Sequence, residues 1–210
     1  MDYLINHYEN LYKKYDKSPL SLQHANISQQ QKRYEIISTK IKPHFSIIDF
    51  GCGFADFYKF LSKNKNYDGK YTGIEIVPSF INENKKYFLK NQKVNFINKN
   101  LLEIEKISSV DYSIACGTFN NFIPNLEGKE YLQNSLLKLF NISRVGISFN
   151  LLSTYVDYKD SSLFYYDPKE VFDFCKLKLS PYVELKHDYI LNEGGYPYEY
   201  TIHVSKNSNI

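Results

Sequence analysis

Two acidic residues and two glycines stand where they could bind a ligand. Asp49 comes near the end of one apolar run, and Gly51 and Gly53 follow it closely. Glu75 comes near the end of the next apolar run along the chain. In a parallel sheet the carboxyl ends of neighbouring strands meet at one edge, where nucleotide-like ligands bind over the backbone N–H groups of a glycine turn. The pattern therefore predicts a nucleotide-like ligand beside two carboxylates.

The glycine turn departs from the fingerprint of dinucleotide-binding proteins. That fingerprint, GxGxxG, requires a third glycine, and Asp56 stands at this position. The third glycine lets a helix close on the strand around a pyrophosphate, so its absence argues against NAD or FAD. Asp49 argues in the same direction, because a carboxylate before the turn repels a pyrophosphate and suits a ligand that carries an ammonium group.

The elements that must position these residues alternate between strand-like and helix-like spacing of apolar residues. The expected strands cover residues 45–50, 70–76, 94–98, 110–116, 145–151, 182–190 and 198–205. The expected helices cover residues 2–15, 56–62, 78–89, 130–140 and 168–177. A further helix should begin at Ser28, which forms a capping box with Gln31, and Pro43 should end it.

This alternation predicts parallel strands that are joined by right-handed crossovers and covered by helices on both faces. The last two strands are close enough in sequence to form an antiparallel hairpin. We therefore expect one α/β domain over residues 1–210, with an N-terminal helical cap at 1–44 and a Rossmann-like core at 45–206.

Length and composition favour a globular enzyme or binding protein in a reducing compartment. The 210 residues suit one domain, and the hydrophobic share of 43% and charged share of 23% are ordinary. The net charge of +3 comes from scattered lysines, so it does not indicate whether the chain binds nucleic acid. The three cysteines form no CxxC pair and the histidines have no ligand-like spacing, so we expect neither a disulfide framework nor a metal.

The same sequence gives no sign of export or of a membrane span. The first residues, MDYLINHYENLYKK, are amphipathic and unlike a signal peptide. No apolar run approaches the roughly 20 residues that a membrane helix needs. We expect a cytoplasmic protein without a membrane partner, either a monomer or a homodimer.

The segment DFGCGFAD resembles the first motif of the class I S-adenosylmethionine-dependent methyltransferases, which is an acid, any residue, Gly, then Cys, Ser or Thr, then Gly. The resemblance implies that Asp49, Gly51, Cys52 and Gly53 bind the cofactor S-adenosylmethionine, whose product is S-adenosylhomocysteine. It also implies that Glu75 chelates both ribose hydroxyls.

Further cofactor contacts follow from the resemblance to this family. Ile76 would pack on the adenine face. Asn100 stands where the family usually has an aspartate, and its amide oxygen could still accept a hydrogen bond from the adenine amino group. Leu101 fits the apolar position that follows. Cys116 and Gly117 would lie along the methionine moiety.

The family's architecture is a Rossmann-like three-layer sandwich. It implies a seven-stranded, mostly parallel sheet of order 3-2-1-4-5-7-6, in which the last strand inserts antiparallel between the fifth and the sixth. The N-terminal helices would then cap the cofactor site.

Four segments resemble, more narrowly, small bacterial methyltransferases that are encoded near surface-polysaccharide genes. They are QQQKRYE, CGTFN, FNLLSTYVDYKDSSLFYYDPKEVFDFC and HDYILNEGGYPYEYTIHV. In that group the helical arginine, here Arg33, would contact the methionyl carboxylate. A solvated cation on an exposed helix face is the alternative for Arg33.

The acceptor should lie near the long segment between the fifth strand and its helix, residues 150–167. A loop of this length is usually functional or disordered, and its aromatic density, which includes Tyr155 and Tyr165, argues against disorder. We interpret it as a lid over the acceptor, with simple packing as the alternative. Asn120 and Tyr189 are further candidates for acceptor binding.

His187 is the candidate general base. A histidine near its free pKa suits proton removal from a hydroxyl acceptor, and His187 would share a face of the expected strand 182–190 with Tyr189. A structural role for His187 is the alternative.

The sequence thus predicts in-line transfer of a methyl group to an oxygen or nitrogen of a small molecule, such as a sugar or a surface-glycan precursor. A closed pocket beneath the helices and the lid favours a small acceptor over a protein or nucleic acid. The alternatives are a non-catalytic S-adenosylmethionine-binding regulator, a nucleotide-dependent oxidoreductase, and an RNA methyltransferase, which would need a basic stripe beside the pocket.

Overall fold

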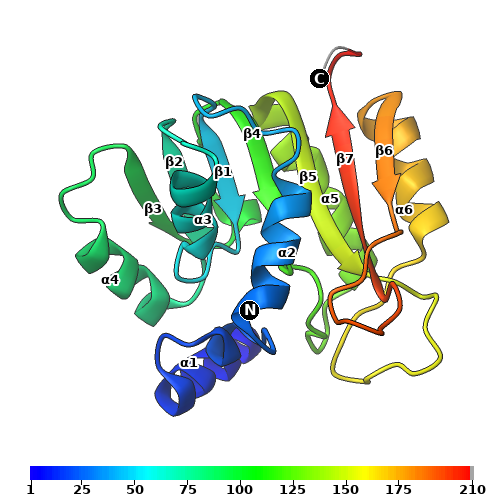
Figure 1. Cartoon of the computed structure of the whole chain (residues 1–210), viewed down its shortest axis with the longest axis horizontal. Coiled ribbons are helices and arrows are strands. Elements are labelled where there is room, and N and C mark those ends of the chain that lie inside the picture. Colours follow the sequence, from blue (N-terminus) through cyan, green and yellow to red (C-terminus); the bar gives the residue numbers. More distant parts are fainter. Residues whose placement is uncertain (209–210) are drawn as a thin grey trace.

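The computed structural model describes residues 1–208 and contains a seven-stranded sheet with the order β3-β2-β1-β4-β5-β7-β6 (Figure 1). The strands are β1 Ile47–Phe50, β2 Tyr71–Glu75, β3 Val94–Asn98, β4 Val110–Ala115, β5 Ser143–Leu152, β6 Tyr182–Lys186 and β7 Glu199–Ser205. β1 to β5 pair in parallel, and β7 runs antiparallel to both β5 and β6. The predicted strand order and the antiparallel insertion of the last strand are confirmed.

Helices cover both faces of the sheet. They are α1 Asp2–Tyr15, η1 Pro19–Leu22, α2 Ile27–Ile37, α3 Asp56–Asn64, α4 Pro78–Tyr87, η2 Leu101–Glu103, α5 Gly128–Ile142 and α6 Pro168–Phe174, with a π-helical turn η3 at Cys175–Leu179. In the view of Figure 1, α2 and α3 lie over the near face and α5 over the far face. α1 lies beyond the sheet, at the end where the arrows of β1 and β4 finish.

The central strands are buried on both faces, which explains their uninterrupted apolar runs. All four residues of β1 are buried, and successive side chains enter opposite cores. Ile47 packs in the core that contains Tyr34 of α2 and Leu61 of α3. Ile48 packs in the core that contains Leu136 of α5. Burial on both faces fixes the register, and with it the positions at which the strands end.

The start and the end of α2 differ from the predicted helix. The N-cap is Asn26, whose side chain accepts a hydrogen bond from the Gln29 N–H at 2.9 Å, so the predicted capping box at Ser28 is wrong. Asparagine is among the strongest N-cap residues, which accounts for the earlier start. The helix ends at Ile37, because the Thr39 N–H and hydroxyl both bind the Ile36 carbonyl.

β6 is shorter than the predicted strand 182–190. Its pairing with β7 stops at Lys186 opposite Thr201, so His187 and Tyr189 lie in the connection to β7. The Tyr189 hydroxyl binds Glu199 and Thr201, at 3.0 and 2.9 Å, and folds this connection back onto β7. The prediction that His187 and Tyr189 share one strand face is therefore wrong.

None of the helices within residues 1–208 is both long and apolar enough to cross a membrane.

Candidate active site

A cavity lies at the carboxyl ends of β1, β2 and β4, beneath the N-terminal cap. Strand ends and the glycine turn form one part of its lining, and α1 with the segment after η1 forms another. The lining residues are Leu4, Tyr8, Leu22, His24, Tyr34, Asp49, Phe50, Gly51, Cys52, Gly53, Phe57, Ile74, Glu75, Ile76, Phe80, Cys116, Gly117, Thr118, Ile123 and Tyr131.

The glycine turn after β1 requires its glycines. Gly51 and Gly53 have φ of 74° and 51°, the left-handed region that other residues avoid. A Cβ at Gly51 would lie 2.5 Å from the Oγ1 of Thr118. That hydroxyl donates to the Phe50 carbonyl at 2.6 Å and ties the end of β1 to the segment after β4. The turn is also tied to β2, because the N–H of Gly51 donates to the Ile74 carbonyl and that of Gly53 to Glu75.

Glu75 is held at the end of β2 by three backbone donors. Its Oε1 accepts from the N–H groups of Ile76 and Val77 at 2.7 and 3.0 Å, and its Oε2 accepts from Gly53 at 3.0 Å. Each carboxylate oxygen offers two acceptor positions, so one position on Oε2 is left for a ligand. Burial raises the pKa of Glu75, and the three backbone donors act against that rise.

Asp49 is the second buried acid of the cavity. It is 2% exposed and accepts a hydrogen bond from the Tyr71 hydroxyl at 2.5 Å. Burial raises the pKa of Asp49 to about 7, and the nearby carboxylates of Glu75 and Asp56 add to the rise. Within residues 1–208 the hydrogen bonds to Asp49 and Glu75 come from the Tyr71 hydroxyl and from backbone N–H groups, and no cationic side chain forms an ion pair with either acid. Two buried acids without a protein cation favour a cationic ligand.

The cap is fastened over the cavity by side chains of α1. Glu9 accepts from the N–H and the hydroxyl of Ser79 at 3.1 and 2.6 Å, at the N-terminus of α4. The Tyr8 hydroxyl accepts from Asn121 at 2.7 Å, in the segment after β4. Burial is the main cause that raises the pKa of Tyr8, so the hydroxyl stays protonated. α1 therefore contacts elements on two sides of the cavity.

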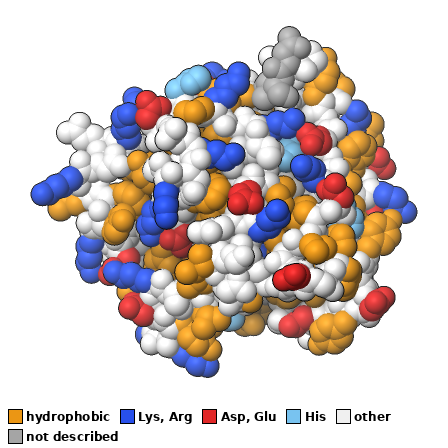
Figure 2. All heavy atoms as spheres, viewed as in Figure 1, with side chains coloured by type: hydrophobic (Ala, Val, Ile, Leu, Met, Phe, Trp, Pro, Cys, Tyr) orange, Lys and Arg blue, Asp and Glu red, His pale blue; other side chains and the backbone are white. Residues whose placement is uncertain are grey.

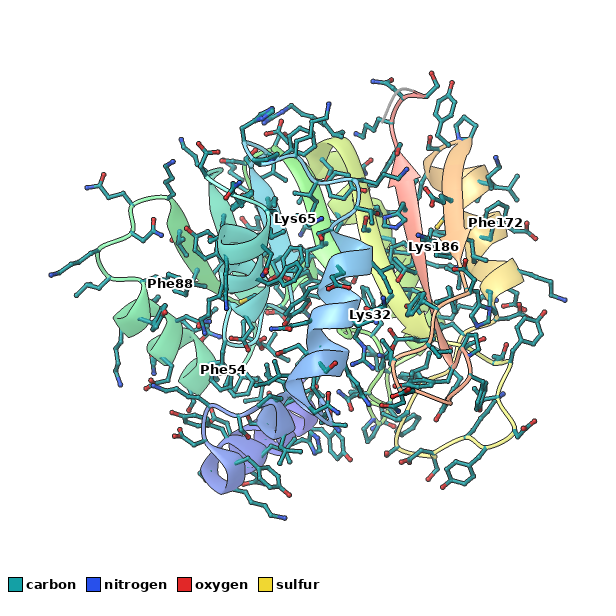
Figure 3. The ribbon with its side chains drawn as sticks, viewed as in Figure 1. Lys32, Phe54, Lys65, Phe88, Phe172 and Lys186 are labelled. Atoms are coloured by element: carbon teal, nitrogen blue, oxygen red, sulfur yellow. The ribbon has the colours of Figure 1, made fainter. Side chains whose placement is uncertain are left out.

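An aromatic cluster joins the cap to the glycine turn. Phe54, directly after the turn, packs on Phe80 of α4 with ring centroids 4.4 Å apart and on Tyr12 of α1 at 5.8 Å. Figure 3 labels Phe54 at this junction, between α1 and the sheet. The cluster makes the side of the cavity next to α4 apolar.

A buried polar network adjoins the cavity at the end of β4. The Gly117 N–H donates to the Asn150 Oδ1 at 2.7 Å, and the Asn150 amide donates to Glu199 at 3.2 Å. Glu199 also accepts from Arg33 Nε at 2.9 Å and from the Tyr189 hydroxyl at 3.0 Å. The side chains of Arg33 and Glu199 are 11% and 1% exposed, so this is a buried ion pair.

Eight of the predicted cofactor residues line the cavity together. They are Asp49, Gly51, Cys52, Gly53, Glu75, Ile76, Cys116 and Gly117. Arg33 is not among the lining residues; it lies behind His24, whose Nδ1 is 3.3 Å from the arginine NH1. Asn100 caps η2 and accepts from the hydroxyl of Tyr131, which does line the cavity, at 3.1 Å. Leu101 is buried in the core beside α5.

The predicted acceptor residues lie outside this cavity. Asn120 accepts from the Leu152 N–H at 3.3 Å and fastens the segment after β4 to β5. Tyr155 is 54% exposed and stacks on His187 with ring centroids 6.0 Å apart. Tyr165 accepts from the Asp160 N–H at 3.1 Å and lines a different cavity, between α5 and α6. Tyr189 joins the network around Glu199.

His187 is placed among aromatic rings. Its Nε2 is buried and has no hydrogen-bond partner in the described part of the chain, and its ring lies 5.6 Å from that of Tyr200. Burial lowers the pKa of His187. The residue does not line the cavity that holds Asp49 and Glu75.

The predicted lid, residues 150–167, is ordered by backbone bridges. Ser153 pairs with Tyr166, and Leu163 pairs with Asn121. The Phe164 N–H donates to the Asn120 carbonyl at 2.8 Å. The lid is thus attached to the same segment after β4 that contacts Tyr8 of the cap.

Several cavity residues had no signal in the sequence. Tyr8 belongs to an apolar stripe of the helix 2–15, and such a stripe predicts packing against the rest of the protein but no contact with a ligand. Leu22 and His24 fall in a segment with a proline and polar residues, which resembled a plain break between helices. Their place at the cavity depends on how the cap folds back over the strand ends.

The face shown in Figure 2 carries basic and acidic side chains interspersed with hydrophobic ones. No continuous basic stripe crosses this face.

No family model matches the chain. The chain is 34% identical over 168 residues to "Putative methyltransferase Rv1506c" of Mycobacterium tuberculosis, an alignment that covers 78% of this chain and 95% of that protein. Two solved structures share its fold. The magnesium protoporphyrin IX methyltransferase ChlM from Synechocystis PCC 6803, with bound SAH, has a TM-score of 0.67 at 8% identity, over 96% of this chain and 94% of that chain. A SAM-dependent methyltransferase from Aquifex aeolicus has a TM-score of 0.61 at 14% identity, over 95% of this chain and 98% of that chain.

Proposed function

We propose that this chain methylates an oxygen or nitrogen atom of a small molecule. The chain belongs to the methyltransferase family of its mycobacterial relative, and it has the fold of class I S-adenosylmethionine-dependent methyltransferases. The observation that carries the proposal is the pair of buried acids, Asp49 and Glu75, near the ends of adjacent strands; within residues 1–208 neither acid forms an ion pair with a cationic side chain. S-adenosylmethionine carries an ammonium and a sulfonium, so a site of this charge suits it.

The residues of the cavity fit this cofactor. Glu75 has one free acceptor position on Oε2 for a ribose hydroxyl. The turn has no side chain at Gly51 or Gly53, which leaves room for a ligand beside the backbone, and Asp49 suits the ammonium group. Ile76 offers an apolar surface for the adenine. Asn100 does not line the cavity, and its Oδ1 already accepts from the Leu102 N–H and the Tyr131 hydroxyl.

When bound, S-adenosylmethionine supplies a methyl group on a positive sulfur, which is already a strong electrophile. The chain then has to orient the two reactants and exclude water. The rigid turn at Gly51 and Gly53 fixes the cofactor, and the aromatic cluster of Phe54 and Phe80 excludes water from one side. His187 does not line the cavity, and we assign it no proton transfer.

The acceptor would approach from the side of the Gly117–Asn150–Glu199 network. Arg33 is neutralised there by Glu199, so no free basic group offers a site for a phosphate backbone. Asn150 and Tyr189 are hydrogen-bonded to Glu199 and do not line the cavity; they fix an uncharged wall beside Gly117, which suits an uncharged acceptor. A sugar or a surface-glycan precursor fits this chemistry and the four segments that resemble polysaccharide-associated methyltransferases. A reducing cytoplasm fits the three free cysteines.

Thermal unfolding with candidate ligands tests the cofactor. S-adenosylhomocysteine at about 100 times its Kd should add about 2.7 kcal/mol to the unfolding free energy and raise Tm by about 5–10 °C. NAD should leave Tm unchanged. For variants that remove Asp49 or Glu75, the matched control is Glu83→Gln, which loses only surface contacts to Lys17 and Lys86. A rise with NAD and none with S-adenosylhomocysteine would refute the proposal.

Transfer of labelled methyl groups tests the acceptor. Incubation with a panel of sugars, nucleotide sugars and RNA should label a sugar fraction only. Labelling of RNA alone would replace the small-molecule acceptor by RNA. Binding without transfer to any fraction would favour a regulatory protein that uses the same cofactor.

A further inference from the structure

His24 is a polar side chain of the cavity, and its residue type and position in the sequence predicted no role for it. It follows η1 and lines the cavity. Its Nδ1 lies 3.3 Å from NH1 of Arg33. No hydrogen bond to its Nε2 occurs among residues 1–208, and Nε2 is not among the buried unpartnered atoms.

The contact with Arg33 determines where the imidazole carries its proton. A guanidinium has five N–H donors and no acceptor. The Nδ1 of His24 must therefore be the acceptor, which leaves the proton on Nε2. Burial and the charge of Arg33 both lower the pKa of His24, to about 3, so the ring is neutral at physiological pH.

Arg33 is itself held from behind. Its Nε donates to Glu199 at 2.9 Å and its NH2 donates to Tyr198 at 3.4 Å. Glu199 is fixed in turn by Asn150 and Tyr189. The imidazole is therefore oriented by a buried chain of hydrogen bonds that begins on β7 and ends at the cavity.

The cofactor has one anionic group, and the cavity has few places for it. The acids Asp49 and Glu75 repel a carboxylate from the ends of β1 and β2. No lysine or arginine lines the cavity within the described residues. His24 is a lining residue whose Nε2–H has no partner within residues 1–208 and whose Nδ1 is held by the Arg33 guanidinium behind it.

We propose that His24 contacts the cofactor, as a neutral imidazole whose Nε2–H donates a hydrogen bond to the carboxylate of the methionine moiety, and that Arg33 is the positioning residue that fixes its tautomer. This inference rests on the proposed function, because it takes S-adenosylmethionine as the ligand. It transfers the predicted carboxylate contact from Arg33 to the residue in front of it.

Calorimetric binding of two ligands tests the contact. Decarboxylated S-adenosylmethionine keeps the adenosine, the sulfonium and the ammonium but lacks the carboxylate. The wild-type protein should bind S-adenosylmethionine about tenfold more tightly than the decarboxylated form. His24→Ala should abolish that difference by weakening S-adenosylmethionine alone. His24→Gln should restore most of it, because its amide N–H reaches about as far as Nε2. His44→Ala, at an exposed histidine, is the control and should change neither affinity.

The outcomes separate this inference from the proposed function. An equal loss for both ligands in His24→Ala, or no loss for either, would overturn the contact and leave the cofactor assignment standing. Failure of the wild-type protein to bind any adenosyl ligand would overturn both.

Nitrogen-15 NMR tests the tautomer without any ligand. The His24 ring signals, assigned by their absence in His24→Gln, should show a protonated Nε2, an unprotonated Nδ1 and no titration between pH 5 and 8. A proton on Nδ1, or a titration near pH 6.5, would overturn the positioning role of Arg33 even if S-adenosylmethionine binds.

Discussion

The substitution Glu75→Gln tests whether Glu75, whose carboxylate is held by three backbone hydrogen bonds, binds the ribose of the cofactor. The carboxylate accepts three backbone N–H groups, at 2.7 to 3.0 Å, and has one acceptor position left. The amide of glutamine keeps one oxygen, which can retain the N–H groups of Ile76 and Val77. The new NH2 group then faces the Gly53 N–H, which needs an acceptor, and offers the ribose hydroxyl a neutral donor in place of a charged acceptor.

Two losses of different kind should follow from Glu75→Gln. The Gly53 N–H loses its partner, which costs about 1–3 kcal/mol of unfolding free energy. The neutral amide is cheaper to bury than the carboxylate, whose pKa is raised by burial, so the net loss should lie near the low end. A ribose hydrogen bond to a charged group is worth about 1.5–3 kcal/mol, so the Kd for S-adenosylhomocysteine should rise by about tenfold to a hundredfold.

Calorimetry for the Kd and urea unfolding for stability separate these effects in the same preparation. Glu83→Gln, which removes a surface carboxylate of α4, should alter neither quantity by more than a small amount. An unchanged Kd in Glu75→Gln, in a protein that is folded, would refute the role of Glu75 at the ribose.

Four further substitutions have distinct expected results. Because the folded-state pKa of Asp49 is about 7 against 3.8 unfolded, this acid destabilises the ligand-free protein progressively as pH rises from about 4 to 7. Asp49→Asn should remove this loss, which is about 1.5 kcal/mol at pH 5 and about 4 kcal/mol at pH 8; urea unfolding at both pH values measures it. In Gly51→Ala the new Cβ would lie 2.5 Å from Thr118, so the variant should be less stable and should bind S-adenosylhomocysteine more weakly in calorimetry. Gly117→Ala is the comparison: its φ is 71° but no atom lies within 4 Å of the new Cβ, so it should cost only about 1–2 kcal/mol of strain. Glu199→Gln should lower the unfolding free energy by about 3 kcal/mol, since it leaves a buried guanidinium without its counter-charge; a loss below 0.5 kcal/mol would show that the pair is not buried in solution.

Features that depend on local pattern were predictable from the sequence. The helix 2–15 and the strand 94–98 have the predicted bounds, because periodicity and turn residues mark both ends. Asp49 and Glu75 meet at one edge because they end adjacent parallel strands, which is a consequence of alternation alone. The strand order was implied by the family resemblance and is confirmed.

Features that depend on tertiary packing were not predictable. Tyr8 and His24 reach the cavity because the cap folds over the strand ends, and no local pattern encodes that path. β6 stops at Lys186 because Tyr189 bonds back onto β7, a contact that competes with strand pairing. A candidate base on the expected strand was thereby placed outside the cavity.

The structure of the protein in complex with S-adenosylhomocysteine would show directly whether the cavity at Asp49 and Glu75 binds the cofactor. We predict that a ribose hydroxyl lies within hydrogen-bond distance of Glu75 Oε2, and that the methionine moiety lies between the Gly51–Gly53 turn and Gly117. A ligand bound in the cavity between α5 and α6, or a ribose without contact to Glu75, would refute the proposed cofactor site.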